Sequence, residues 1–128
     1  MTEDVVLVVD DDADTRQLLK LMIEDTFAVR TLLAQDGAEA LEHLSVMTPS
    51  LVLLDIRMSR MDGISLARQL KSSSATRDIP LIALTGWSKA CDDALQAGCC
   101  DFVEKPFEID DLLNKVRKHL VGEHATTT

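Results

Sequence analysis

The sequence has little of what several classes of protein require. It contains no Tyr, one Trp and three Phe in 128 residues, and 13 Lys and Arg stand against 22 Asp and Glu. A nucleic-acid surface needs clustered basic side chains, so the formal net charge of −9 argues against direct nucleic-acid binding. No apolar run reaches the roughly 18 residues of a membrane span. The short acidic start is unlike a signal peptide. We therefore expect a cytoplasmic protein that does not associate with membranes.

Cysteine is also scarce. The three cysteines, Cys91, Cys99 and Cys100, are odd in number and show no Cys-x-x-Cys spacing. The three histidines are not spaced with them as metal ligands are. The sequence therefore indicates neither a disulfide framework nor a zinc site. We interpret the cysteines as buried or half-buried thiols of a reducing compartment.

Five apolar segments alternate with five helical patterns. We expect strands at 5–9, 29–33, 51–54, 80–84 and 101–104, the second with the weaker alternation of an edge. Apolar residues at helical spacing include Leu18, Leu19, Met22, Ile23 and Phe27 in the first helix, Leu95 in the fourth, and Ile109, Leu112, Leu113, Val116 and Leu120 in the last. Short connections between strands and helices favour an α/β fold with a doubly wound, five-stranded parallel sheet covered by helices on both faces.

Local signals place the ends of these elements. Asp36 and the pair Asp62-Gly63 are expected to open helices, Gly98 to follow a helix end, and residues 71–78 to form a loop. We expect one domain over residues 1–121 and a disordered C-terminal tail over 122–128.

Polar side chains follow four of the expected strands. Asp10 and Asp11 come after the first, Asp55 after the third, Thr85 after the fourth and Lys105 after the fifth. The carboxyl ends of parallel strands share one edge of the sheet, where such folds bind ligands. Clustered carboxylates repel one another, and a divalent cation that prefers oxygen ligands, such as Mg²⁺, offsets that repulsion.

This set of groups suits phosphoryl transfer better than proton transfer. Asp10 and Asp11 can hold Mg²⁺, while Asp55 can be both a metal ligand and a carboxylate nucleophile that forms an acyl phosphate. Lys105 supplies a mobile positive charge, and Thr85 supplies a hydroxyl donor. Without the neighbouring carboxylates, Thr85 would be interpreted as a hydroxyl that caps a loop, and Lys105 as a solvated surface charge.

Two neighbours of these residues are interpreted differently. Asp12 is expected to cap the first helix rather than to bind metal, because a carboxylate is favoured at the positive end of a helix. Gly86 leaves the backbone N–H beside Thr85 free of side-chain crowding.

Five segments, in order, resemble the response-regulator receiver domain: Val8-Val9-Asp10-Asp11-Asp12, Leu53-Leu54-Asp55-Ile56-Arg57-Met58, Met61-Asp62-Gly63, Ala83-Leu84-Thr85-Gly86 and Val103-Glu104-Lys105-Pro106-Phe107. The resemblance runs from about residue 5 to residue 120. It implies the flavodoxin-like strand order 2-1-3-4-5. It also implies two-component signalling, in which Asp55 receives a phosphoryl group from a histidine kinase or a histidine phosphotransfer protein.

The resemblance assigns further roles. Mg²⁺, or Mn²⁺ in its place, would be bound by Asp10, Asp11, Asp55 and the backbone carbonyl of Arg57. Thr85 and Lys105 would contact the phosphoryl group, Thr85 and Phe102 would form the switch, and residues 88–120 would contain the output face. Such a domain is not an enzyme; it is a phosphoacceptor that assists its own phosphorylation and dephosphorylation. Our hypothesis is that Arg57 and Trp87 flank the site and partly cover it.

The sequence departs from the family pattern in three places. Ser59 stands where the family usually has proline, and Phe102 stands where tyrosine is commoner. The interval from Thr85 to Lys105 is about two residues shorter than the family's, so the fourth helix or the loop before it should be trimmed.

Other functions stay open at this point. A degenerate receiver would keep the fold and act as a phosphorylation-independent interaction module. An aspartate-nucleophile phosphatase of the haloacid-dehalogenase type needs Asp-x-Asp-x-Thr or Val, where this chain has acid at Asp14. A flavodoxin-like flavin carrier would need a hydroxyl- and glycine-rich phosphate loop after the first strand, and the three aspartates there would repel the flavin phosphate. The downstream partner, a separate protein or a missing effector domain, is also open, as is a phosphorylation-dependent dimer.

Overall fold

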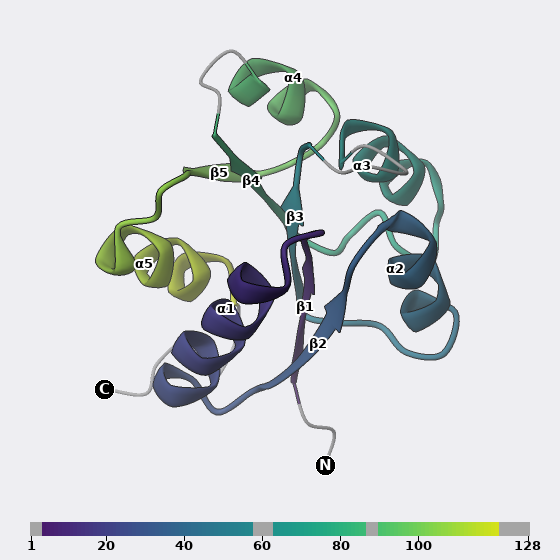
Figure 1. Cartoon of the computed structure of the whole chain (residues 1–128). Coiled ribbons are helices and arrows are strands. Elements are labelled where there is room, and N and C mark those ends of the chain that lie inside the picture. The colour runs from purple at the N-terminus through teal and green to yellow at the C-terminus, as the bar shows by residue number, and fades with distance from the viewer. Residues whose placement is uncertain (1–3, 58–62, 87–89, 121–128) are drawn as a thin grey trace.

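Strands and helices alternate along the whole described chain. The computed structural model describes residues 4–57, 63–86 and 90–120, without the side chains of 90 and 91. The elements are β1 (Val5–Val9), α1 (Ala13–Thr26), β2 (Arg30–Ala34), α2 (Gly37–Leu44), β3 (Leu51–Asp55), α3 (Gly63–Ser72), β4 (Leu81–Thr85), α4 (Ala90–Gln96), β5 (Asp101–Glu104) and α5 (Ile109–His119). The strands form one parallel sheet in the order β2-β1-β3-β4-β5 (Figure 1). The predicted fold class and strand order are confirmed.

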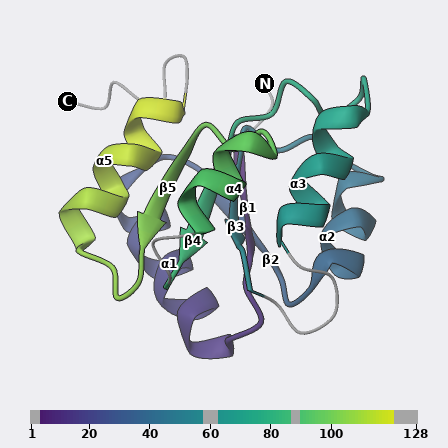
Figure 2. The same ribbon diagram turned by 90° about the horizontal axis from the view of Figure 1, so that it is seen from above.

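Helices cover both faces of the sheet, which explains why its strands are continuous apolar runs. Figures 1 and 2 show α1 and α5 on one face and α2, α3 and α4 on the other. Alternate residues of β1 point to the two sides: Val6 and Val8 join the core under α1 and α5, and Leu7 and Val9 join the core under α2, α3 and α4. All four are fully buried.

The expected element ends are mostly accurate. β1 and β5 have the predicted bounds, and α3 begins at Gly63. β2 starts one residue later than expected, and β4 starts at Leu81 because Pro80 has no N–H to give to the sheet. The predicted loop is wrong for Lys71 and Ser72, which belong to α3. The Lys71 ammonium donates to the carbonyls of residues 77 and 79, both at 2.8 Å, and so ties the last turn of α3 to the segment after it.

Three of the apolar residues at helical spacing are exposed. Leu18 is 50% exposed, Leu95 43% and Ile109 56%. Leu18 and Ile109 line a hollow between α1 and the start of α5, together with Met22 and Phe107.

Caps at the helix ends follow the sequence signals. Asp12 caps α1 and accepts the Thr15 N–H at 3.1 Å, so its carboxylate serves the helix as expected. Asp36 accepts the Glu39 N–H at 2.8 Å. Gly98 follows α4 with a φ of 113°, a left-handed conformation that favours glycine. Of the helices that the structure describes, none has both the length and the apolar character needed to cross a membrane.

Candidate functional site

Three carboxylates meet at the carboxyl ends of β1 and β3, as the sequence predicts. Oxygen atoms of Asp10, Asp11 and Asp55 all lie within 4.8 Å of one another. Asp10 is fully buried, Asp55 is 5% exposed and Asp11 is exposed. The cluster therefore has a buried floor and an open side, which is the shape of a site that a cation and a ligand can enter from solvent.

Backbone contacts fix the orientation of Asp10. Its N–H donates to the carbonyl of Ala34 at 3.0 Å, which extends the β1–β2 pairing by one residue. Its Oδ1 accepts the N–H of Asp12 at 2.9 Å. The Asp10 carbonyl accepts Nη1 of Arg16 at 2.7 Å, a contact that our sequence reasoning did not identify. One carboxylate oxygen is thus held by the turn into α1, and Oδ2 faces the site.

Asp55 is the last residue of the central strand, β3. Its Oδ1 accepts the N–H of Arg57 at 3.1 Å, and its Oδ2 lies 3.5 Å from the ammonium nitrogen of Lys105. Burial, with the nearby charge of Asp10, raises the pKa of Asp55 even though the Arg57 N–H and Lys105 act in the opposite direction. The ionised carboxylate is therefore held at a cost in free energy that a cation or an added positive charge reduces.

Lys105 bridges two carboxylates. Its Nζ lies 2.9 Å from Oδ2 of Asp10 and 3.5 Å from Oδ2 of Asp55. Burial alone would lower the pKa of this lysine, but the hydrogen bond and charge of Asp10 and the charge of Asp55 outweigh burial, and the pKa is raised. Lys105 is therefore a charged group at neutral pH, and its ammonium already contacts the carboxylate expected to react.

Thr85 and Lys105 are joined through the backbone. Thr85 is the last residue of β4 and is fully buried, and its carbonyl accepts the N–H of Lys105 at 2.7 Å. Gly86 is exposed, and among the described residues the nearest atom to a Cβ built on it would be Cβ of Lys105, at 4.0 Å. This position therefore has room for a small side chain.

Gly63 has a role beyond opening α3. A Cβ at this position would lie 2.3 Å from the carbonyl oxygen of Asp55 and 2.7 Å from Cα of Ile56. The N–H of Gly63 donates to the carbonyl of Ile56 at 3.0 Å. The missing side chain lets the first turn of α3 pack directly on the backbone that carries Asp55. The motif Asp62-Gly63 in the sequence contained this signal, but we interpreted it only as a helix start.

Comparison with known proteins identifies the family. The family model described as the response regulator receiver domain matches residues 6–117. The chain belongs to this family. It is 36% identical over 116 residues to the chemotaxis protein CheY of Bacillus subtilis, covering 90% of this chain and 96% of CheY. It is 37% identical over 115 residues to the response regulator MprA of Mycobacterium sp. strain KMS, covering 88% of this chain and 48% of MprA, so it spans about half the length of that relative.

Solved structures agree with this assignment. The signal receiver domain of a signal transduction histidine kinase from Syntrophus aciditrophicus superposes with a TM-score of 0.86 and is 32% identical. The match covers 98% of this chain and 97% of that one. The likeness thus extends over the sheet and its helices, and the chain is a receiver domain of the kind used in two-component signalling.

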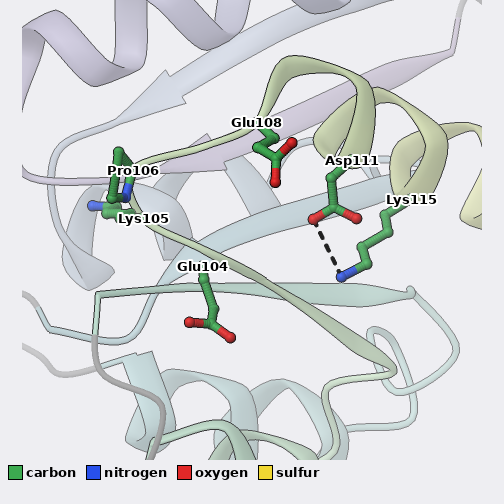
Figure 3. A pocket seen from close by; sticks show the side chains of 6 residues that line it. All are labelled: Glu104, Lys105, Pro106, Glu108, Asp111 and Lys115. Carbon is green, nitrogen blue, oxygen red and sulfur yellow. Dashed lines mark ion pairs between the residues drawn. The ribbon is translucent and has the colours of Figure 1, made fainter.

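Phe102 lies within β5 of the receiver and is half-buried. Its carbonyl accepts the Lys115 ammonium at 2.7 Å, and the same ammonium lies 5.1 Å from the centre of the Phe102 ring. Lys115 also pairs with Asp111 at 3.5 Å. Figure 3 shows this pair at one end of a pocket whose other lining residues include Glu104, Lys105, Pro106 and Glu108. The aromatic position therefore neighbours a charged hollow that continues to the site lysine.

The other residues expected to flank the site are only partly described. The side chain of Arg57 is exposed, and its backbone N–H contacts Asp55. Trp87 and Ser59 lie outside the described residues, as does the tail expected over 122–128. α4 is the shortest helix in the described part of the chain, with seven residues.

Proposed function

We propose that this receiver domain accepts a phosphoryl group on Asp55 from a histidine kinase or a histidine phosphotransfer protein. The observation that carries the proposal is the convergence of three carboxylates and one ammonium at the ends of β1, β3 and β5. Asp55 is the member of this set that ends the central strand, and a carboxylate there can act as the nucleophile that forms an acyl phosphate.

The donor set fits Mg²⁺, with Mn²⁺ as an alternative ion. Asp10, Asp11 and Asp55 bring three carboxylates, the hard oxygen ligands that Mg²⁺ prefers, to within 4.8 Å of one another. Among the described residues, one ammonium, that of Lys105, pairs with these carboxylates, so the described group as a whole stays negative. The backbone carbonyl of Arg57 is proposed as a further ligand. Bound there, the cation would neutralise negative charge on the phosphoryl oxygens.

The protein's own groups have complementary roles in the transfer. An oxygen of Asp55 attacks the phosphorus atom of the donor, and the bond from phosphorus to the donor nitrogen breaks. Lys105 is already 3.5 Å from Asp55 and pairs with a phosphoryl oxygen. The hydroxyl of Thr85 donates to another. When water attacks the acyl phosphate, the bond from phosphorus to the Asp55 oxygen breaks, and inorganic phosphate and the free carboxylate are formed. The domain thus assists its own phosphorylation and dephosphorylation and is not an enzyme acting on a separate substrate.

Phosphorylation changes the charge of a packed site and thereby switches the surface beyond it. The phosphoryl group adds about −1.5 to −2 charge, by analogy with other phosphorylated side chains. Thr85 and Phe102 are proposed to transmit the change. Thr85 is the last residue of β4, and the ring of Phe102 in β5 lies beside the ammonium of Lys115 in α5. A two-state surface then favours a downstream protein, an effector domain or a second copy of the chain.

The residues around the mouth of the site set the lifetime of the acyl phosphate. We propose that the exposed side chain of Arg57, with Trp87, partly covers the phosphoryl group. Replacing each with alanine should shorten the half-life of phosphate on Asp55. Unchanged half-lives in both variants would contradict this part of the proposal.

The central claim is tested with a small phosphoryl donor. The protein is incubated with acetyl phosphate and Mg²⁺, and its intact mass is measured. We expect a gain of one phosphoryl group in the wild type, no gain in Asp55→Asn, and no gain when Mg²⁺ is chelated. A wild type without the gain would indicate a phosphorylation-independent interaction module, and the same gain in Asp55→Asn would place the phosphoryl group elsewhere.

A further inference from the structure

A second cluster of reactive groups lies at the opposite end of β5 from Lys105. The sulfur of Cys100 is 3.4 Å from Nδ1 of His119, and Nε2 of His119 is 3.0 Å from Oδ2 of Asp101. Cys100 and Asp101 stand at the start of β5, and His119 is the last residue of α5. A thiol, an imidazole and a carboxylate are thus arranged in series, and the roles proposed above use none of them.

The contacts on the two ring nitrogens assign each group a role. We assign His119 the tautomer whose Nε2–H donates to Asp101, so that the lone pair of Nδ1 faces the sulfur of Cys100, whose thiol also lies 3.4 Å from the Leu81 carbonyl oxygen. This is the arrangement of a nucleophile, a base and a group that orients the base. The Asp101 carboxylate is itself held by the N–H of Phe102 at 2.9 Å. Burial would raise the pKa of Asp101, but the hydrogen bond to His119 and its other contacts outweigh burial and lower it, so the carboxylate is ionised at neutral pH.

The base is necessary because the surroundings otherwise disfavour the thiolate. Burial, together with the negative charge of Asp101, raises the pKa of Cys100, although backbone hydrogen bonds, chiefly the one at Leu81, and the charge of Lys71 act in the opposite direction. Lys115 faces the cluster from α5 and lies 3.9 Å from Asp101. Without a proton acceptor, a thiol at this position would react more slowly than a free cysteine.

The neighbouring cysteine provides a reference within the same chain. Cys99 is 4% exposed, and burial raises its pKa to about 12, whereas Cys100 is exposed. The two thiols are adjacent in sequence, but only Cys100 has both access to solvent and a base, so the pair separates an inert thiol from an activated one.

We propose that Cys100 is a site of covalent thiol modification, with His119 as its base, Asp101 as the positioning residue and small disulfides of the glutathione type as its reactants. The proton of the Cys100 thiol moves to Nδ1 of His119 as the sulfur attacks one sulfur of the disulfide. The disulfide bond breaks, and its electron pair leaves with the second sulfur, which takes the proton from His119. Cys100 is oxidised to a mixed disulfide, and the departing half is reduced to a thiol.

The test measures the rate of mixed-disulfide formation at each cysteine. The full chain is incubated with oxidised glutathione at a series of pH values, and the adduct is located by peptide mass. We expect the adduct on Cys100 and not on Cys99, with a rate at pH 7 at least about tenfold higher in the wild type than in His119→Gln. Asp101→Asn should lie between them, because it leaves the base in place but no longer orients it.

The pH profile distinguishes a base from a merely structural histidine. A thiol that reacts only as its thiolate gains about tenfold in rate per pH unit below its pKa. We expect this slope in His119→Gln and a flatter profile in the wild type between pH 6 and 8. Equal rates in the two proteins, a tenfold slope per pH unit in the wild type, or equal labelling of Cys99 and Cys100 would overturn the proposal. Cys100→Ser and His119→Gln should accept phosphate from acetyl phosphate as the wild type does, which verifies their folding and keeps this test separate from that of Asp55.

Discussion

Gly63→Ala tests how closely the phosphoacceptor strand and α3 are packed. The added methyl would lie 2.3 Å from the Asp55 carbonyl oxygen and 2.7 Å from Cα of Ile56. Ordinary contacts between such atoms begin near about 3.4 Å, so the helix and the strand end must separate by about 1 Å. Both contacted atoms belong to the backbone, so no side chain can rotate away to make room.

The expected destabilisation follows from this overlap. Forcing a methyl group into a packed region costs about 1–3 kcal/mol, and weakening the hydrogen bond from Gly63 to Ile56 adds about 1 kcal/mol. We expect the free energy of unfolding to fall by about 2–4 kcal/mol, which for a chain of this size lowers Tm by roughly 7–15 °C. Because Asp55 is the residue displaced, phosphorylation by acetyl phosphate should slow as well.

Gly86→Ala is the matched control, since it adds the same methyl beside the same site. In the described part of the chain, the heavy atom nearest to the added methyl would be Cβ of Lys105 at 4.0 Å, an ordinary contact, so stability should stay within about 0.5 kcal/mol of the wild type. Urea denaturation followed by circular dichroism measures both variants. Equal stabilities for the two variants would refute the reasoning about close approach. A destabilised Gly63→Ala that is phosphorylated at the wild-type rate would refute the link between this contact and the position of Asp55.

Three further predictions concern the charges of the site. Burial, above all, raises the pKa of Asp55 from its ordinary value of 3.8, so ionisation of this group destabilises the fold as the pH rises from 3.8 through the raised pKa. Without divalent cations, Asp55→Asn should therefore be more stable than the wild type at pH 7 by on the order of 1 kcal/mol. In urea denaturation, this difference in stability should shrink as the pH is lowered toward 4. A difference that grows on acidification would contradict the sign. In thermal denaturation, Mg²⁺ at about one hundred times its Kd should stabilise the wild type by about 2.7 kcal/mol. Asp11→Asn should lose most of this stabilisation by Mg²⁺. Asp12→Asn should keep it, because the Asp12 carboxylate caps α1. Equal responses in the two variants would remove the distinction between these neighbours. Lys105→Met should lower the free energy of unfolding by about 1–3 kcal/mol, because it leaves the buried Asp10 carboxylate without its ammonium partner. Adding Asp10→Asn should recover most of this loss. A coupling energy near zero in the double-mutant cycle would contradict this prediction.

The layout of the site could be predicted from the sequence because it depends on strand ends. The short, continuous apolar runs 5–9 and 51–54 favour strands buried on both faces, and a parallel sheet brings the residues at the ends of such strands to one edge. The convergence of Asp10, Asp11, Asp55 and Lys105 followed from that rule alone. The strand order came from the family resemblance, because periodicity does not determine which strands are neighbours.

Other features depend on distances that spacing does not encode. The spacing at Gly63 shows a helix start, but only the structure shows that its Cβ position is occupied by the backbone of Asp55. Leu18 and Ile109 fit a helical stripe, yet they face a hollow between helices, because the width of a stripe is set by the neighbouring element. The contact between Arg16 and the Asp10 carbonyl joins the first turn of α1 to the residue that follows β1, and no motif marks it.

The cluster of Cys100, Asp101 and His119 is the clearest case of an arrangement that the spacing of residues in the sequence does not encode. In the sequence, Cys100 and His119 are separated by nineteen positions and follow no ligand or catalytic spacing. They meet because α5 runs back along β5, so that the last residue of the helix lies beside the first residue of the strand. The same antiparallel return places Lys115, one turn earlier on α5, against the carbonyl of Phe102 and near Asp101. A single helix–strand pair therefore sets both the proposed switch aromatic and the proposed thiol site. Since a modification at Cys100 enters at the start of the strand and phosphorylation acts beyond its end, the two events can be measured independently on one chain.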